Sequence, residues 1–122
     1  MPNATVNFDT ERHDLKTLPG GFVELKRMSY GQVVERRSML KLSVAQTKGS
    51  KDFKGEMAMA NREITMFEFK VCIVNHNLTD ANDRQLNLGG QMDFTSLDPR
   101  VGQEIESLIS DMNNFEDDDQ EN

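Results

Sequence analysis

The feature that most constrains the fold of this chain is a regular series of apolar residues in its central part. They recur in alternating steps of three and four residues and comprise Met57, Ala60, Ile64, Phe67, Val71, Val74 and Leu78. This spacing places side chains on one face of an α-helix. Further apolar residues of the same segment lie off that face, and they are Met59, Met66, Phe69, Cys72 and Ile73. The sequence therefore predicts a central helix over residues 57–77 that has neighbours on both sides.

The N-terminal part of the chain has a pattern typical of a small β-hairpin. Residues 14–18 and 22–28 resemble two short strands, and Pro19 and Gly20 between them favour a turn. Beyond this segment the apolar spacing changes from strand-like to helical. We therefore expect a hairpin followed by helices.

Two further helices have recognisable starts. The S-x-x-Q sequence at Ser29 is a capping box and predicts a helix over residues 30–44. Asp98 is suited to the N-cap and Pro99 to the first helical position of a helix over residues 98–112. The expected fold is α+β and mainly α, with a small N-terminal hairpin and about three helices.

The chain of 122 residues fits one domain. We expect that domain over residues 14–113, after a loose segment at residues 1–13. Residues 114–122 are predicted to be a disordered acidic tail, because they contain five acidic residues and one apolar residue and cannot offset the entropy lost on ordering.

Charge is distributed unevenly along the chain, whose formal net charge is -7. Residues 11–70 contain 12 basic and 8 acidic residues, whereas residues 71–122 contain 2 basic and 12 acidic residues. An acidic balance argues against bulk binding of nucleic acid, which depends on neutralised phosphates. The chain also lacks an apolar run long enough for a membrane span, a recognisable secretory signal, and a second cysteine for an internal disulfide. These features predict a protein of the reducing cytoplasm.

The sequence offers few groups for catalysis. Cys72 and His76 are four residues apart on the predicted central helix, a spacing that suits two metal ligands or a thiol and its base. Because the only other histidine, His13, lies in the loose segment, a buried apolar role for Cys72 is the favoured interpretation. Neither pair of adjacent glycines lies in a phosphate-binding motif. We therefore expect no catalytic residue, no metal site and no cofactor.

Partner binding is the remaining kind of function that the residues indicate. The chain has seven methionines besides Met1, and flexible methionine surfaces suit adaptable grooves, although they also fill ordinary cores. The candidate partner-binding residues of the central helix are Met57, Met59, Met66, Phe69 and Ile73. A basic connector near Phe53 offers a second possibility, either a contact for phosphate or an acidic protein or simply a solvated surface. Its basic residues are Lys48, Lys51 and Lys54, with Arg36, Arg37 and Lys41 nearby in the sequence.

Three segments together resemble a known family. They are LPGGFVELKRMSYG at residues 18–31, CIVNHNLTD at residues 72–80, and LDPRVGQEI at residues 97–105. In this order the chain is similar, over about residues 14–115, to the tail assembly chaperones of long-tailed, siphovirus-like bacteriophages.

The resemblance implies a protein made in the cytoplasm of the infected host cell. Such a chaperone binds the tape measure protein, keeps its long hydrophobic helices soluble and helps to recruit tail tube protein, and it is not retained in the mature virion. A homo-oligomer fits this description, whereas direct binding of nucleic acid or membrane does not. Programmed ribosomal frameshifting near the end of such reading frames often yields a longer minor product.

Two other functions remain open from the sequence. The acidic second half fits a regulatory or DNA-mimic protein that occupies a basic protein surface. A minor structural protein of the virion is the weaker alternative. The genes beside this one distinguish these possibilities, since a chaperone gene should precede a very long, helix-rich reading frame.

Overall fold

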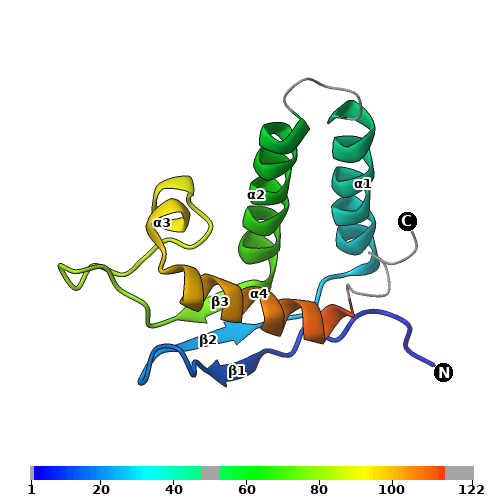
Figure 1. The fold of residues 1–122 in the computed structure, drawn as a ribbon. Coiled ribbons are helices and arrows are strands. Elements are labelled where there is room, and N and C mark those ends of the chain that lie inside the picture. Colours follow the sequence, from blue (N-terminus) through cyan, green and yellow to red (C-terminus); the bar gives the residue numbers. More distant parts are fainter. Residues whose placement is uncertain (1, 48–52, 115–122) are drawn as a thin grey trace.

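A computed structural model of the chain describes residues 2–47 and 53–114, with side chains described over 2–41, 61–90 and 92–114. In these ranges the chain forms a three-stranded antiparallel sheet and four helices (Figure 1). The fold is α+β and mainly helical, which confirms the predicted class.

The sheet contains β1 (Glu11–Asp14), β2 (Phe22–Leu25) and β3 (Ile73–His76), in the order β1-β2-β3. A hairpin is present as predicted, but its first strand is Glu11–Asp14 and not residues 14–18, so that strand lies mainly in the segment that we expected to be loose. Gly20 in the connection has φ of +86°, a conformation that other residues rarely adopt. The turn thus depends on the glycine that the sequence places there.

Helices α1 (Tyr30–Thr47) and α2 (Phe53–Cys72) lie side by side and antiparallel, and together they extend away from the sheet (Figure 1). The predicted capping box is present at the start of α1. The Ser29 hydroxyl accepts a hydrogen bond from the Gln32 N–H at 3.3 Å, and the Gln32 side chain accepts one from the Ser29 N–H at 3.0 Å. These two bonds satisfy donors that the first turn of a helix leaves without partners.

Helix α4 (Pro99–Asn113) crosses the sheet (Figure 1). It follows the short helix α3 (Gln91–Ser96), which was not expected from the sequence. The Asp98 carboxylate accepts a hydrogen bond from the Arg100 N–H at 2.9 Å, so the predicted N-cap is confirmed. The side of α4 toward the core is lined by Val101, Ile105 and Ile109, all buried.

One core joins the sheet, the lower part of α2 and α4. Its buried members are Leu15, Val23, Leu25, Met28, Phe69, Cys72, Leu78, Leu88, Val101, Ile105 and Ile109. Because α2 packs against α1, α4 and β3, it is the central helix with neighbours on several sides, as predicted.

The predicted end of the central helix was wrong. The helix ends at Cys72, and Ile73–His76 continues as β3, which pairs with β2. Two β-branched residues, Ile73 and Val74, favour the extended conformation, and the exposed edge of β2 provides main-chain partners. The pairing is irregular at this point, because Glu24 pairs with Asn75 and Leu25 with Ile73, which leaves Val74 as an extra residue in β3. Val74 is 51% exposed, whereas Leu78, which follows the strand, is buried, so the apolar spacing of the sequence does not continue on one face here.

Several predictions concern residues outside the description. They include the acidic tail beyond Asn114, Lys48 and Lys51 of the basic connector, and the side chains of Lys54, Met57 and Met59. Across the described ranges, no helix combines the length and apolarity needed to cross a membrane.

Candidate functional site

A hollow lies where α1, α2 and α4 meet. It has a volume of about 390 Å³ and is lined by Arg36, Leu40, Asn61, Ile64, Thr65, Glu68, Glu106 and Ser110. Each helix contributes residues that are four positions apart, which places them one above the other on one helix face. The hollow is therefore bounded by three helix ridges, as a groove for a further helix would be.

A second hollow, of about 180 Å³, lies beside the first and shares Thr65 and Glu106 with it. Its other lining residues are Phe69, Phe94, Leu97, Asp98, Pro99, Gly102 and Gln103. We refer to the two adjoining hollows together as the helix groove. It runs from α1, across α2 and α4, to the beginning of α4 beside α3.

A buried ion pair lies in the wall of the helix groove. The Arg36 guanidinium donates to the Glu68 carboxylate at 2.9 Å, and the side chains are 9% and 8% exposed. Ion pairs this deeply buried hold both partners in fixed positions, because separation would leave a charge away from water. The pair therefore fixes α1 against α2 beside the groove.

The boundary between the two hollows is polar. The Thr65 hydroxyl lies 2.9 Å from a Glu106 carboxylate oxygen and 3.0 Å from the Asn61 carbonyl oxygen, and these two acceptors share its single proton. The contact with Glu106 links α2 to α4. On either side of this bridge lie apolar groups, namely Ile64 in the first hollow and Phe94 and Leu97 in the second. Phe94 packs edge-on against Phe69, with ring centroids 5.5 Å apart.

This lining suits an amphipathic helix better than a small polar ligand. Apolar side chains of such a helix can contact the half-buried Leu40 and Leu97, and a basic side chain can approach Glu106. Glu106, Glu68 and Asp98 give the groove three carboxylates against the single guanidinium of Arg36. The small residues Gly102 and Ser110 on α4 permit close approach of another backbone.

The candidate partner-binding residues predicted from the sequence do not form one surface. Phe69 is 1% exposed and belongs to the core, although it also borders the second hollow of the helix groove. Ile73 lies in β3 rather than on the helix, and Met66 lies on nearly the opposite side of α2 from Ile64. The side chains of Met57 and Met59 are outside the description.

The helix groove was missed because its residues are mostly polar. Arg36 was assigned to the basic surface, but it is buried in the ion pair with Glu68. The available signal was a polar residue, Glu68, four positions after Ile64 on the apolar side of the central helix. Buried acids of this kind require a basic partner.

The suspected pair of Cys72 and His76 is not a helical pair. Cys72 is fully buried at the end of α2, where burial, with a smaller effect from the Glu68 charge, raises the pKa of its thiol to about 12. His76 lies in β3, where its Nδ1 accepts a hydrogen bond from the Leu78 N–H at 3.0 Å, and burial lowers its pKa. Within the described residues, no group of three His, Cys, Asp or Glu side chains could hold a metal ion.

The sequence segments at residues 18–31, 72–80 and 97–105 lie together in the structure. They contain β2, β3 and the first half of α4, and they meet in the core beneath the helix groove. Asn77 connects two of them, because its side chain accepts from the Phe22 N–H at 2.8 Å and donates to the Gly20 carbonyl at 2.9 Å. Comparisons of the chain with protein-family models, curated proteins and solved structures give no match.

Proposed function

We propose that this protein is a tail assembly chaperone of a long-tailed bacteriophage. In this proposal it binds helices of the tape measure protein, keeps that protein soluble and promotes assembly of the tail tube around it. It acts in the cytoplasm of the infected cell and is not retained in the mature virion. The resemblance of the three sequence segments supplies the identity of the client.

The helix groove is the observation that supports this proposal most directly. Helices α1, α2 and α4 border it with residues at a spacing of four, and the ridges on the surface of a client helix have the same spacing. Apolar groups on both sides of the Thr65–Glu106 bridge can cover the apolar stripe of a client helix, while Glu106 favours a basic residue beside that stripe. Burial of apolar client surface is the gain expected of a holdase-type chaperone, at about 25 cal/mol per square ångström.

The proposal assigns the protein no catalytic step. Its proposed action is stoichiometric binding, and it uses neither a cofactor nor a metal. Cys72, with its raised pKa and full burial, is in the proposal a core residue. Binding of the client would be complete before the tail is finished, after which the chaperone is released.

A bulky residue placed in the groove tests the proposal. Ser110 lines the groove, whereas Ser107 on the same helix is exposed and does not line it. We expect Ser110→Phe to reduce the fraction of co-expressed tape measure protein that remains soluble by about tenfold or more, because the new ring occupies the space of the client helix. Ser107→Phe adds the same side chain to the same helix and should leave solubility unchanged.

Thermal melting of both variants must show that they remain folded. Equal solubilisation by folded Ser110→Phe and by the original protein would remove the groove as the client site. If neither form solubilises the tape measure protein encoded downstream of this gene, the chaperone function itself is wrong.

A further inference from the structure

The two edges of the sheet differ in how they are protected. At one edge, β1 consists of Glu11, Arg12, His13 and Asp14, and such ionisable side chains discourage pairing with another strand. At the other edge, β3 has the sequence Ile-Val-Asn-His and contains no Asp, Glu, Lys or Arg. The outer edge of β3 is therefore the side of the sheet that is open to a further strand.

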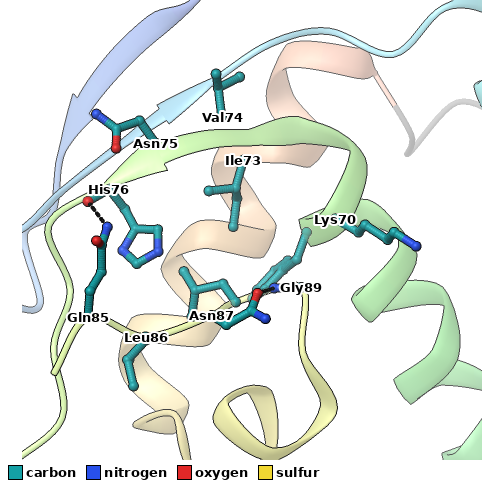
Figure 2. A pocket seen from close by; sticks show the side chains of 11 residues that line it. Lys70, Ile73, Val74, Asn75, His76, Gln85, Leu86, Asn87 and Gly89 are labelled. Carbon is teal, nitrogen blue, oxygen red and sulfur yellow. Dashed lines mark hydrogen bonds between the residues drawn. The ribbon is translucent and has the colours of Figure 1, made fainter.

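A hollow of about 290 Å³ lies along this edge (Figure 2). All four residues of β3 line it, together with residues 85–89 and with Phe69 and Lys70 at the end of α2. Figure 2 shows the side chains of Ile73 and His76 directed into this space, whereas those of Val74 and Asn75 point away from it. Between Ile73 and His76 the wall of the hollow is thus formed by the main chain of β3.

The register of the sheet identifies main-chain groups that face the hollow. Asn75 pairs with Glu24 of β2, and the Asn77 N–H donates to the Phe22 carbonyl, so residues 75 and 77 direct their main-chain groups toward β2. Main-chain groups of successive residues in a strand point to opposite edges. The N–H and carbonyl of His76 therefore lie at the outer edge.

The carbonyl of His76 at the outer edge already has a hydrogen-bond partner, which is a side chain. The Gln85 carboxamide donates to the His76 carbonyl at 2.9 Å, as the N–H of a neighbouring strand would. The chain pairs with itself only briefly here, through the Thr79–Gln85 bridge and the bond from the Leu86 N–H to the Leu78 carbonyl at 2.9 Å. Leu86 still contacts β3, because its main chain bonds to the His76 imidazole, but residues 86–89 form no bridge with the strand, and the hollow lies between them and β3.

The charge of the lining restricts what can bind. Lys70 is the one Asp, Glu, Lys or Arg residue among the residues that line the hollow, although the protein as a whole has a net charge of -7. An acidic side chain is therefore accommodated better here than beside the carboxylates of the helix groove. An extended main chain can pair with the outward N–H and carbonyl of His76.

We propose that the outer edge of β3 binds an extended peptide strand that carries an acidic side chain, in place of the Gln85 carboxamide. This mode of recognition is strand addition, in which main-chain hydrogen bonds supply affinity. It does not depend on the chaperone function or on the helix groove. A segment of a partner protein that is unfolded or in extended form can therefore be held while the groove holds a helix.

Two synthetic peptides test the role of the main chain. The probe is an acetylated octapeptide in which Thr and Val alternate around one central Glu, and the control has the same side chains but N-methyl groups on alternate amides. We expect the full-length protein to bind the probe at micromolar to millimolar concentration, with amide NMR shifts at residues 73–76 and 85–89. The N-methylated control should bind at least about tenfold more weakly, since each methyl group removes a donor.

The structure also predicts a gain of binding. Gln85→Ala removes an exposed side chain that competes for the His76 carbonyl, so the probe should bind about fivefold more tightly, the amount expected for one neutral hydrogen bond. Asn82→Ala removes an exposed amide that lines neither this hollow nor the helix groove, and it should leave binding of the probe unchanged. Lys70→Gln should abolish the preference for the central Glu over Gln in the probe.

The following results would each overturn the proposal that β3 binds a peptide strand. No binding at millimolar probe, equal binding of the N-methylated peptide, or shifts confined to residues outside 73–76 and 85–89 would show that β3 does not accept a strand. Weaker binding by Gln85→Ala would show that Gln85 contacts the peptide instead of competing with it for the His76 carbonyl. Ser110→Phe should bind the probe normally, which separates this test from that of the helix groove.

Discussion

The Arg36 guanidinium and the Glu68 carboxylate lie 2.9 Å apart between α1 and α2, and neither side chain is more than 9% exposed. Their burial is costly by itself, because both charges lose contact with water. What the pair provides is a fixed alignment of the two helices, since a shift of one helical turn would leave two buried charges apart. The position of the helix groove depends on that alignment.

Removal of one partner of this pair should destabilise the protein strongly. We expect Glu68→Gln to lower the free energy of unfolding by about 3 to 5 kcal/mol, because the Arg36 charge would remain buried without its carboxylate. The double variant Arg36→Met with Glu68→Leu should be more stable than Glu68→Gln alone. Urea unfolding of the three proteins measures both differences, and equal losses in the single and double variants would contradict a coupled buried pair.

The hydrogen bonds of the Glu104 carboxylate lead us to expect a loss of stability in acid. Its carboxylate accepts hydrogen bonds from the N–H groups of Lys16 and Thr17 and from the Thr17 hydroxyl, at 2.8, 2.9 and 2.6 Å, and these bonds lower its pKa. A carboxylate with a lowered pKa in the folded state contributes stability above its unfolded pKa of about 4.3, and this contribution disappears as pH falls through the folded pKa.

The expected result is a melting temperature that falls below about pH 4.3 more steeply in the original protein than in Glu104→Gln. At pH 7 the variant should be the less stable of the two, because its neutral amide accepts weaker hydrogen bonds from residues 16 and 17. Since Asp80, Asp93 and Asp98 also have lowered pKa values, the difference between the two proteins isolates the part due to Glu104. If the melting temperatures of the two proteins fall in parallel as pH decreases, Glu104 does not contribute to the loss of stability in acid.

The capping box of α1 gives a prediction of moderate size. Ser29→Ala should cost about 1 kcal/mol of stability, because the Gln32 N–H loses its acceptor, whereas Ser29→Gly should cost only a few tenths. Chemical unfolding at neutral pH measures both changes. A greater loss for Gly than for Ala would indicate that the side-chain bond is not what stabilises the start of α1.

Local chemical rules predicted the starts of α1 and α4, whereas α2 begins four residues before its expected start. Ser29, Asp98 and Pro99 act through bonds or restrictions within a few residues, so their roles can be inferred without knowledge of the fold. Repeated apolar spacing likewise identified α2. Its end was misplaced because residues 73–76 become a strand only through pairing with β2, which lies about fifty residues earlier in the chain.

The sites depend still more on tertiary contacts. Arg36 and Glu68 are separated by 32 positions, and Thr65 and Glu106 by 41. No spacing rule joins such residues in a single sequence. The edge of β3 was also hidden, because Cys72 and His76 suggested a helical pair, and only the observed strand makes the main chain of residues 73–76 a potential binding surface.

The buried thiol of Cys72 leads to the last prediction, a loss of stability in alkali. Its pKa is raised to about 12 in the folded protein, mainly by burial, whereas an exposed thiol titrates near 8.5. The unfolded chain therefore releases the thiol proton first as pH rises, and stability is full below about pH 8.5 and declines toward pH 12. Cys72→Ala lacks this proton, so its stability should fall less over the same pH range, although a cavity makes it less stable at pH 7.

Urea unfolding of both proteins between pH 7 and pH 10 measures how steeply the free energy of unfolding falls with pH. Modification of Cys72 by a thiol reagent at pH 8 should occur only as fast as the protein opens. Rapid labelling of the folded protein, or equal slopes for the two proteins, would show that Cys72 is accessible and is not the sealed core residue at the junction of α2 and β3.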